Sequence, residues 1–464
     1  MDAGCRVLVA RHPGETRWAL LAPEPAQGQG PAALPLAELP SGERVLALRL
    51  VRDHRLQVGE IHLGRVGDRL PGHEAAFVAL AAGPDGLLDA RDAPQGLPPQ
   101  GALVLVEVKR AAIAEKGPRL STAVTLAGRL VTLGRGRPGS GLSPRIGPAA
   151  RRKALSALLK QHCAEQEALV ARTAAAAAAD TAILDELVAL RARFTDLEAR
   201  AASAKEPCCL WGGPTPAELW QAHWPVSEIQ AEGLGAAWRA SLPEDLQERV
   251  TLRLPRTDQG GLFDETGLSE LLDQMAQTDV ELPGGGAVRV EVTSALWALD
   301  VDARRCPPGQ AAQEAVAALP DLLRLFDLRG QILIDPPRGP KGQPDRRLEG
   351  QLRGFLASQP DAQDPSSARL LGATPGGLLE LRRGGGYDPL PVLIRGTEHQ
   401  ILRALALVTR SGAPGAAGLR LGTLAHGLLT RSLSAAKREA EQRLGTAIAL
   451  HLDPALPEGH VSIS

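Results

Sequence analysis

Cysteine is scarce in this chain of 464 residues, which contains only Cys5, Cys163, Cys208, Cys209 and Cys306. Their number is odd, and no two of them form a CxxC pair. This usage argues against a disulfide framework and against a structural zinc site, and it is typical of a reducing compartment. We therefore expect no zinc in this protein.

Long apolar runs are also missing. No run approaches the roughly 20 residues that a membrane-spanning helix needs. The N-terminal stretch MDAGCRVLVARHPGETRWALL has no basic segment followed by a long apolar one, as a secretory leader would. We expect a cytoplasmic protein without a membrane span.

Motifs of several common enzyme classes are absent or out of context. The ten histidines show no HExxH spacing. The segment GRGRPG, Gly134 to Gly139, matches GxGxxG, but it continues into Pro and Ser rather than into a helix, and no acidic residue follows at the required distance. The sequence therefore predicts neither an HExxH metal site nor a dinucleotide-binding site.

Acidic residues are nearly absent from one segment, although the whole chain has a net charge of -1. Between Lys109 and Lys160 there are twelve Lys or Arg residues and a single acid, Glu115. A block of this length has a strongly positive local field, so a polyanionic partner is favoured over a merely solvated basic face.

The order of apolar runs and turns predicts a mixed α/β protein with several domains. Short strands are expected over residues 1–54. About five more are expected over residues 55–128, where Gly, Pro and Asp turns separate them as in a small closed barrel of the OB type. Helices are expected over residues 149–203, with the alanine run Ala174–Ala179 in the middle of one. Two further α/β segments follow, 258–385 and 386–464.

One aromatic residue is notable because aromatic residues make up only 3% of the chain. Phe77 lies on an expected barrel strand, His62 lies nearby in the barrel, and Lys116 and Arg119 follow. Barrels of this type bind single strands by stacking bases on aromatic side chains while cations hold the backbone. These four residues are therefore candidates for contacts to single-stranded RNA. A core position for Phe77 is the alternative.

Three aspartates follow two apolar strands. LWALDVD ends in Asp300 and Asp302, and QILIDP contains Asp335. With the helix between them these strands form a βαβ-like unit, so both acidic tips are expected at strand C-termini, within reach of one ion. Carboxylate oxygens there suit Mg²⁺, which can supply a nucleophilic hydroxide for phosphodiester hydrolysis. The alternative is that the aspartates are ordinary turn residues.

The chain resembles the ribonuclease E/G family of endoribonucleases. The motifs that carry the resemblance occur in the family's order and span nearly all of the sequence. They are GETRWALL, VGEIHLGRVGDRLPGHEAAFV, EKGPRLSTAVTLAGRLVTL, LVARTAA, GGLFDETGLSELL, VELPGGGAVRVEVTSALWALDVDAR, LLRLFDLRGQILIDP and GGLLELRR.

The resemblance implies a division into domains. An RNase H-like domain is expected to be interrupted by an S1 RNA-binding barrel and a 5′-phosphate sensor region, and a DNase I-like catalytic domain and a small C-terminal domain are expected to follow. The RNase H-like domain is expected at 1–54 with 207–257, the S1 barrel at 55–128 and the sensor region at 129–206. The catalytic domain is expected at 258–385 and the C-terminal domain at 386–464.

The resemblance also implies functional residues. Arg172 and Thr173 in LVARTAA match the pair that binds a 5′-monophosphate. Asp300 and Asp335 match the carboxylates that hold Mg²⁺, and Asp302 stands where the family usually has Asn. We expect Asp302 to help the other two aspartates in metal binding and catalysis.

The chain departs from the family's motifs around these carboxylates. The family's DVNSGR is DVDARR here, so that a small Gly becomes Arg304; Arg304 and Arg305 are expected to steady the scissile phosphate. Ser294 replaces a Glu, Ala312 replaces an Asn, and Arg338 stands where a second acid is usual. The family's CPxC zinc link is absent, so its tetramer is not implied.

The resulting hypotheses belong to different classes of protein. The first is a cytoplasmic, Mg²⁺-dependent endoribonuclease that acts on single-stranded RNA and senses a 5′-monophosphate, with a homodimer as a possible assembly. The second is an RNA-binding paralogue that has lost cleavage, because the catalytic surroundings are altered while barrel and sensor are intact. The third, a structural partner-binding protein, predicts no affinity for RNA.

Overall fold

The computed structural model describes residues 4–22, 34–112, 117–255, 260–293, 295–338, 345, 347–362, 367–384, 389–411 and 418–463. Lys116 and Ser294 lie outside the described residues, as do residues 385–388, where the zinc link is missing. The protein is of mixed α/β type and divides into two compact units. Unit 1 comprises residues 1–54 and 216–464, and unit 2 comprises residues 55–215.

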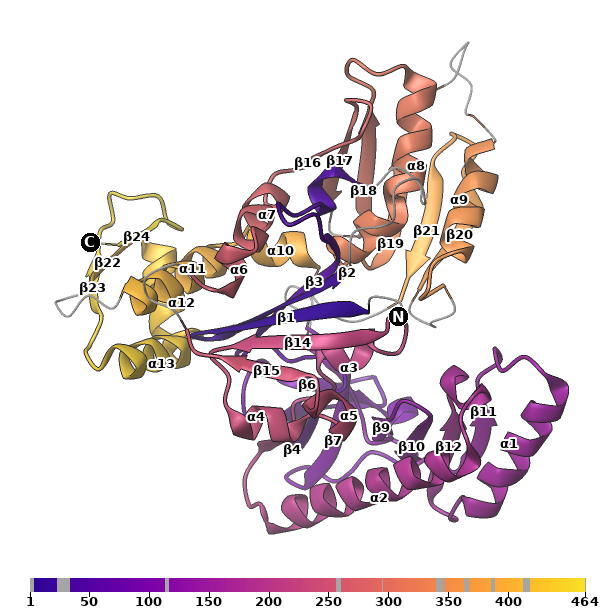
Figure 1. Ribbon diagram of the computed structural model, residues 1–464. Coiled ribbons are helices and arrows are strands. Elements are labelled where there is room, and N and C mark those ends of the chain that lie inside the picture. Colours follow the sequence, from indigo (N-terminus) through magenta and orange to yellow (C-terminus); the bar gives the residue numbers. More distant parts are fainter. Residues whose placement is uncertain are drawn as a thin grey trace. The chain divides into compact units, whose positions relative to one another are not determined.

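Unit 1 begins with a five-stranded sheet in the order β15-β14-β1-β2-β3 (Figure 1). Its strands are β1 (Cys5–His12), β2 (Glu15–Ala22), β3 (Arg44–Arg52), β14 (Val226–Glu232) and β15 (Val250–Arg253). Successive side chains of a strand point to opposite sides, and β1 has an apolar core on each side. Leu8 and Ala10 enter one core cluster, and Val7 and Val9 enter another.

A six-stranded sheet of unit 1 has the order β16-β17-β18-β19-β21-β20. Its strands are β16 (Asp279–Glu281), β17 (Ala287–Val292), β18 (Trp297–Asp302), β19 (Gly330–Asp335), β20 (Ala368–Ala373) and β21 (Leu379–Arg383). One face packs on α8 (Pro308–Leu325) and α9 (Arg347–Ala357), which lie side by side in Figure 1. β18, α8 and β19 form the expected βαβ unit, with β18 and β19 parallel.

Buried and exposed side chains alternate along β18 and the end of β19. Leu299 and Val301 of β18 and Ile334 of β19 are buried in the core shared with α8, whereas Asp300 and Asp335 between or beside them are exposed. The period of two that separates an apolar face from a polar one therefore creates an open face on this sheet. We call this surface the open face.

Shorter helices complete the first part of unit 1. They are η1 (Pro35–Ala37), α3 (Pro216–Trp220), α4 (Ala236–Ser241), α5 (Glu244–Gln247), α6 (Leu262–Glu265), α7 (Leu268–Met275) and α10 (Leu390–Ile394). α7 contacts both η1 and α10, and α10 contacts β3. These contacts join the five-stranded and the six-stranded sheet through one continuous apolar core.

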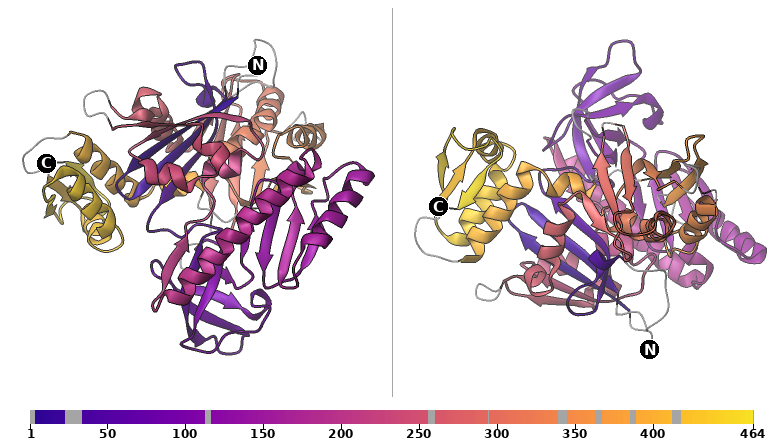
Figure 2. Two further views of the ribbon diagram at one scale, coloured as in Figure 1. Left: turned by 60° about the horizontal axis from the view of Figure 1, so that its bottom comes forward. Right: turned by 90° about the horizontal axis from the view of Figure 1, so that it is seen from above.

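The C-terminal part of unit 1 has its own small core. Three helices, α11 (Thr397–Ser411), α12 (Thr423–Thr430) and α13 (Ser434–Leu444), pack with a sheet of order β23-β22-β24. The strands are β22 (Gly418–Leu421), β23 (Ala449–Leu452) and β24 (Val461–Ile463). These elements form the yellow group in both views of Figure 2. In the described part of the chain, no helix combines the length and the apolar character needed to cross a membrane.

Unit 2 contains a five-stranded closed barrel, β4-β5-β6-β8-β7, in which β7 also pairs with β4. The strands are β4 (Ile61–Arg69), β5 (Ala75–Ala79), β6 (Gly86–Asp89), β7 (Leu103–Arg110) and β8 (Arg119–Ser121), with η2 (Ala90–Asp92) after β6. Val78, Leu88, Val106 and Leu120 fill the interior. A Cβ at Gly86 would lie 2.4 Å from Leu120, so the tight interior requires glycine there.

The remainder of unit 2 is a four-stranded sheet covered by helices. The sheet has the order β11-β12-β10-β9, with β9 (Thr125–Ala127), β10 (Val131–Arg135), β11 (Gly139–Leu142) and β12 (Glu167–Ala171). α1 (Ala149–His162) packs on β11 and β12, and the long α2 (Asp180–Ser203) packs on β10, as the left view of Figure 2 shows. β13 (Cys208–Trp211) then returns to pair with β4.

The alanine run differs from the expectation. Thr173–Ala176 forms a 3₁₀-helix, η3, and α2 begins only at Asp180. Alanine permits a helix but does not specify where it begins, whereas an acidic side chain in the first turn favours the helix terminus. The run is therefore an entry to α2 rather than the middle of a helix.

Candidate functional site

Two of the three predicted aspartates are neighbours on the open face. Asp300 of β18 and Asp335 of β19 are register partners in a parallel pair, and both are exposed. Register partners on adjacent strands present their side chains to the same face, about 5 Å apart. The two carboxylates therefore point to the same patch of solvent.

Asp302 does not join this pair. It is the last residue of β18, two positions beyond the residue that pairs with the end of β19, and its Oδ1 accepts a hydrogen bond from the backbone N–H of Arg304 at 2.9 Å. Within the described residues, no group of three or more His, Cys, Asp or Glu side chains is arranged to hold a metal ion. The expectation that three carboxylates converge is corrected to a pair, because Asp302 acts as a local turn cap.

The chemistry of the pair nevertheless fits a hard cation. Mg²⁺ is commonly bound through one or two carboxylates and keeps several of its waters, which an exposed site allows. Two adjacent carboxylates also repel one another unless a cation lies near them. Asp300 and Asp335 are thus the residues that could hold Mg²⁺ on this face.

Cationic side chains flank the pair on the β17 side. Arg289 of β17 is the register partner of Asp300 in the antiparallel direction, so it lies on the same face. Its Nε donates to Asp279 Oδ1 at 2.9 Å, and Nη2 of Arg304 donates to Asp279 Oδ2 at 2.6 Å. The hydrogen bond from Arg289 is the main reason why the pKa of Asp279 is lowered. Asp279 is thus held ionised between two guanidinium groups.

Arg304 and Arg305 occupy the turn after β18. Arg304 has a φ of 47°, in the left-handed region that a glycine adopts freely. Arg305 is exposed. The position at which the chain replaces a glycine is thus one where glycine has a conformational reason to occur.

The other departures near the pair are structural in character. Ala312, on α8, is buried in the core. Glu314, also on α8, accepts a hydrogen bond from the N–H of Gly284 at 2.8 Å and one from Gln310. Glu314 therefore stabilises the turn between β16 and β17 rather than pointing to the carboxylate pair.

The barrel brings its predicted aromatic and one predicted arginine into one row. Phe77 on β5 pairs with Leu87 on β6, Leu87 pairs with Arg119 on β8, and Arg119 pairs with Arg110 on β7. Register partners share a face, and Phe77 is 37% exposed, so it is not a core residue. The row therefore combines a stacking surface with two guanidinium groups, of which Arg110 was not foreseen from the sequence.

His62 is a correction to the predicted RNA-contacting set. Only 3% of the residue is exposed, and its Nε2 lies 2.8 Å from Oε2 of Glu60. A side chain enclosed in this way has no face for a base or a phosphate. His62 is a structural residue at the pairing of β4 with β13, where it is the register partner of Cys209.

The predicted sensor residues follow β12 and contact two loops of unit 2. The backbone N–H of Arg172 donates to Leu130 O at 2.8 Å, and its guanidinium donates to the carbonyl of Gly128. Thr173 Oγ1 lies 3.0 Å from Ser143 Oγ. Arg172 therefore adjoins the turn between β9 and β10, whereas Thr173 contacts the segment after β11.

That turn is held by a carboxylate. Glu186 of α2 accepts hydrogen bonds from the backbone N–H groups of Arg129, Leu130 and Val131, at 2.7, 2.7 and 2.8 Å. Three consecutive N–H groups around one anion form a nest. Glu186 thus fixes the loop to which the side chain of Arg172 is bonded.

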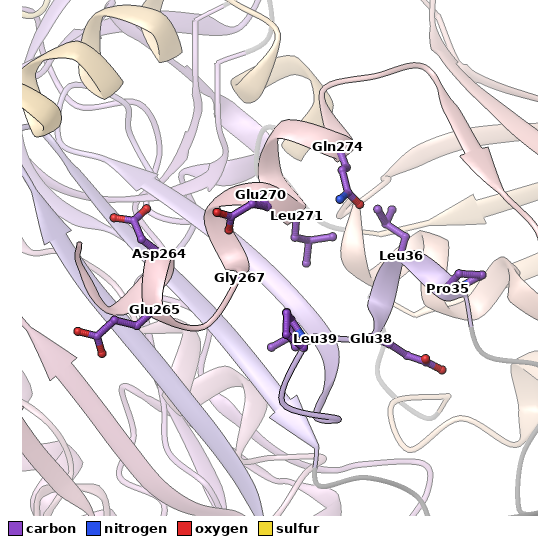
Figure 3. Close-up of a pocket in the computed structure, with 11 residues that line it drawn as sticks. Pro35, Leu36, Glu38, Leu39, Asp264, Glu265, Gly267, Glu270, Leu271 and Gln274 are labelled. Atoms are coloured by element: carbon purple, nitrogen blue, oxygen red, sulfur yellow. The ribbon is translucent and has the colours of Figure 1, made fainter. Parts of the chain in front are cut away.

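A hollow of about 650 Å³ lies elsewhere in unit 1, between the segment around η1 and helices α6 and α7 (Figure 3). Leu36, Leu39 and Leu271 provide apolar lining, whereas Glu38 and Glu270 contribute carboxylates. Asp264 and Glu265 also line it. An acidic hollow repels a phosphate backbone, so this feature is not a candidate RNA site.

Comparison with known proteins agrees with the geometry. The family model described as "Ribonuclease E/G family" matches residues 125–384, more than half of the chain. Ribonuclease G of Escherichia coli (strain K12) is 24% identical over 310 residues, which cover 60% of this chain and 63% of that protein. Ribonuclease E of Nostoc sp. is 26% identical over 332 residues, covering 65% and 48% of the two chains. The chain thus spans less than two thirds of either relative.

The sheets and the closed barrel define a mixed α/β protein with a five-stranded barrel of the S1 or OB type. The paired carboxylates lie near the ends of two strands of one of these sheets. The chain belongs to the ribonuclease E/G family.

Proposed function

We propose that this protein is a Mg²⁺-dependent endoribonuclease that cleaves single-stranded RNA during RNA processing or decay. The observation that carries the proposal is the register pairing of Asp300 with Asp335 on the open face. Membership of the ribonuclease E/G family supports the same reaction class.

The catalytic roles follow from the chemistry of the pair. Asp300 and Asp335 would hold Mg²⁺, which supplies an activated water and offsets negative charge on the phosphodiester. Asp302 orders the turn that carries Arg304 and adds a carboxylate nearby. Arg304 and Arg305 then bring positive charge to the scissile phosphate.

The RNA strand would be guided by the barrel. Phe77 offers a ring for base stacking, and Arg119 and Arg110 in the same row offer contacts to phosphates. Lys116, predicted from the sequence to join them, lies outside the described residues. Arg172 and Thr173 would bind a 5′-monophosphate beside the turn that Glu186 holds.

The domain assignments are part of the same proposal. Residues 1–54 with 207–257 were expected to be RNase H-like; we move the start of the second range to 216, because β13 pairs with β4 in unit 2. Residues 55–128 would be an S1 barrel and 129–206 the sensor region. Residues 258–385 would be DNase I-like, and 386–464 a small C-terminal domain. We place the protein in the cytoplasm, with RNA as its partner, a homodimer as a possible assembly and no zinc.

The test uses the full chain and a 5′-monophosphorylated single-stranded oligonucleotide with a 3′ fluorophore. Cleavage should rise as Mg²⁺ is added, and Asp300→Asn or Asp335→Asn should reduce it at least about 100-fold, because each removes a negatively charged ligand. Glu349→Gln, an exposed substitution on α9 on the opposite face of the sheet, is the control and should cleave like the parent. Equal cutting by Asp300→Asn and the control would reject the proposal.

The rival function, an RNA-binding paralogue that no longer cleaves, is favoured by one observation. Among the described residues, only two carboxylates, those of Asp300 and Asp335, are brought side by side at this position, and arginines flank them. In that case RNA binding is tight and salt-sensitive, but adding Mg²⁺ produces no turnover at any concentration. The same oligonucleotide assay therefore separates the two functions.

A further inference from the structure

One cluster of charged residues on the open face is not explained by metal binding. It consists of Asp279 on β16, Arg289 on β17 and Arg304 in the turn after β18. Residues 10 to 25 positions apart in the sequence are thus gathered on the open face, on the β16 side of Asp300.

Asp279 orients both arginines. It accepts hydrogen bonds from Nε and Nη2 of Arg289, at 2.9 and 3.3 Å, and from Nη2 of Arg304, at 2.6 Å. Arg304 Nη1 also lies 3.7 Å from Glu281. One carboxylate is therefore shared by two guanidinium groups, and neither Nη1 group has a hydrogen-bond acceptor within the structure that is described.

Stability alone gives little reason for this arrangement. The side chains of Arg289 and Arg304 are 48% and 34% exposed, and ion pairs at such sites contribute at most about 1 kcal/mol. The left-handed backbone of Arg304, in contrast, costs about 1 kcal/mol or more for a residue with a Cβ. A strained residue retained at an exposed position points to a ligand.

The ligand must be an anion with several oxygen atoms. Guanidinium groups that are fixed in direction bind phosphate through paired hydrogen bonds more specifically than a freely moving cation does. Arg289 is the register partner of Asp300, and its guanidinium turns to Asp279 on β16. An anion held by it therefore lies on the β16 side of Asp300, on the same face as the carboxylate pair.

We propose that Arg289 and Arg304, oriented by Asp279, form a clamp that holds an RNA phosphate on the β16 side of Asp300, one phosphate or more away from the metal-binding pair, and does not require the metal ion. The inference rests on the proposed function for its ligand, but it assigns a separate binding step to residues other than the carboxylate pair. Because backbone phosphates carry no base information, the clamp contributes affinity and position without sequence preference.

The experiment measures binding without cleavage. The full chain carrying Phe77→Ala, which reduces binding by the barrel, is titrated against a short fluorescein-labelled single-stranded RNA in EDTA at several salt concentrations. Arg289→Gln and Arg304→Gln should each weaken binding roughly fivefold to tenfold and lower the slope of log affinity against log salt by about 0.7. Arg353→Gln, which removes an exposed arginine from α9 in an ion pair with Glu349, is the charge-matched control and should change neither.

Asp279→Ala distinguishes a clamp from simple charge. If the arginines acted only through net charge, removing a carboxylate would tighten RNA binding; a clamp whose arginines have lost their orientation binds more weakly. Tighter binding by Asp279→Ala, or unchanged affinity and slope in both arginine variants, overturns the clamp. Melting temperatures within about 2 °C of the parent show that each variant is folded.

The result is independent of the fate of the proposed nuclease. Unchanged binding by the arginine variants, together with loss of Mg²⁺-dependent cleavage in Asp300→Asn, rejects the clamp alone. Weakened binding by the arginine variants in a protein that never cleaves retains the clamp and rejects the nuclease.

Discussion

At the scale of single residues, Arg304 is the position where conformation and charge conflict. Its φ of 47° favours glycine, yet its guanidinium bonds to Asp279. The sequence could show that a glycine of the family is replaced, but the strain became evident only from the backbone.

We expect the backbone strain to be measurable. Arg304→Gly should be more stable than Arg304→Ala by about 1 kcal/mol, because both lose the ion pair but only alanine keeps a Cβ in the left-handed region. Urea-induced unfolding of the two variants under the same conditions measures the difference. The opposite order, with alanine the more stable, would mean that the turn relaxes and stores no strain.

How far residue roles could be predicted depends on whether they follow from strand geometry. The neighbouring positions of Asp300 and Asp335 follow from the βαβ order, and the structure has them in register. The role of Asp302 depends on a hydrogen bond within a turn, and the burial of His62 depends on β13, which returns from more than 140 positions later. Neither is visible in local spacing.

At the scale of elements, the turn between β9 and β10 depends on a helix that is distant in sequence. Glu186 lies 55 to 57 positions away from the three N–H groups that it accepts. Neither Glu186 nor Arg289 was foreseen from the sequence, because each acts through an element that local patterns do not bring together. The signal for Arg289 was present only as a charged residue on the polar side of the alternating strand AVRVEV.

Glu186→Gln should loosen the turn and, with it, the sensor. The amide offers one acceptor oxygen where the carboxylate offers two, and it has no charge, so at least one of the three N–H groups loses its partner and the others bond more weakly, at a cost of about 1 to 3 kcal/mol. The preference for a 5′-monophosphorylated over a 5′-hydroxyl oligonucleotide should fall, because the carbonyl of Gly128 that anchors Arg172 belongs to the same loop.

The measurement is the ratio of cleavage rates, or of RNA affinities, for the two oligonucleotides. Asp196→Asn, an exposed substitution on the same helix in a weak ion pair with Arg200, serves as the control. A ratio that stays the same in Glu186→Gln while stability falls would assign Glu186 a purely structural role.

At the scale of the whole molecule, a buried ionic network connects the N-terminal strands of unit 1 to its C-terminal helix α11. Glu15 is fully buried between Arg17 Nε at 2.9 Å and Arg52 Nε at 3.1 Å, and Nη1 of Arg52 donates to Glu398 at 2.9 Å. Although burial opposes its charge, the two arginines lower the pKa of Glu15 to about 2. His399 lies in the same region.

This network makes stability depend on pH. Burial lowers the pKa of His399 from 6.5 to about 4, so the folded protein keeps it neutral where the unfolded chain takes up a proton. The stability contributed by neutral His399 is therefore present above pH 6.5 and is lost as the pH falls from 6.5 to about 4. Burial also lowers the pKa of His12, which acts in the same direction.

Replacing His399 should reduce that dependence. Between about pH 7.5 and pH 5, the parent should lose about 2 kcal/mol more stability than His399→Leu does, because the variant has no proton to bind there. Thermal unfolding at both pH values measures the difference, with the exposed His451→Gln as control. Parallel losses in parent and His399→Leu would exclude His399 as the cause.

The first and last strands of unit 2 pair with each other, which bears on whether unit 2 could be removed from the chain. β13, the last strand of unit 2, pairs with β4, its first, so that Trp211 lies opposite Ile61. A Cβ on Gly213 would come within 3.2 Å of Gly59, so the segments just inside both ends run against each other. The two ends of the segment 55–215 therefore lie close together, and a linker of a few residues could replace the whole segment.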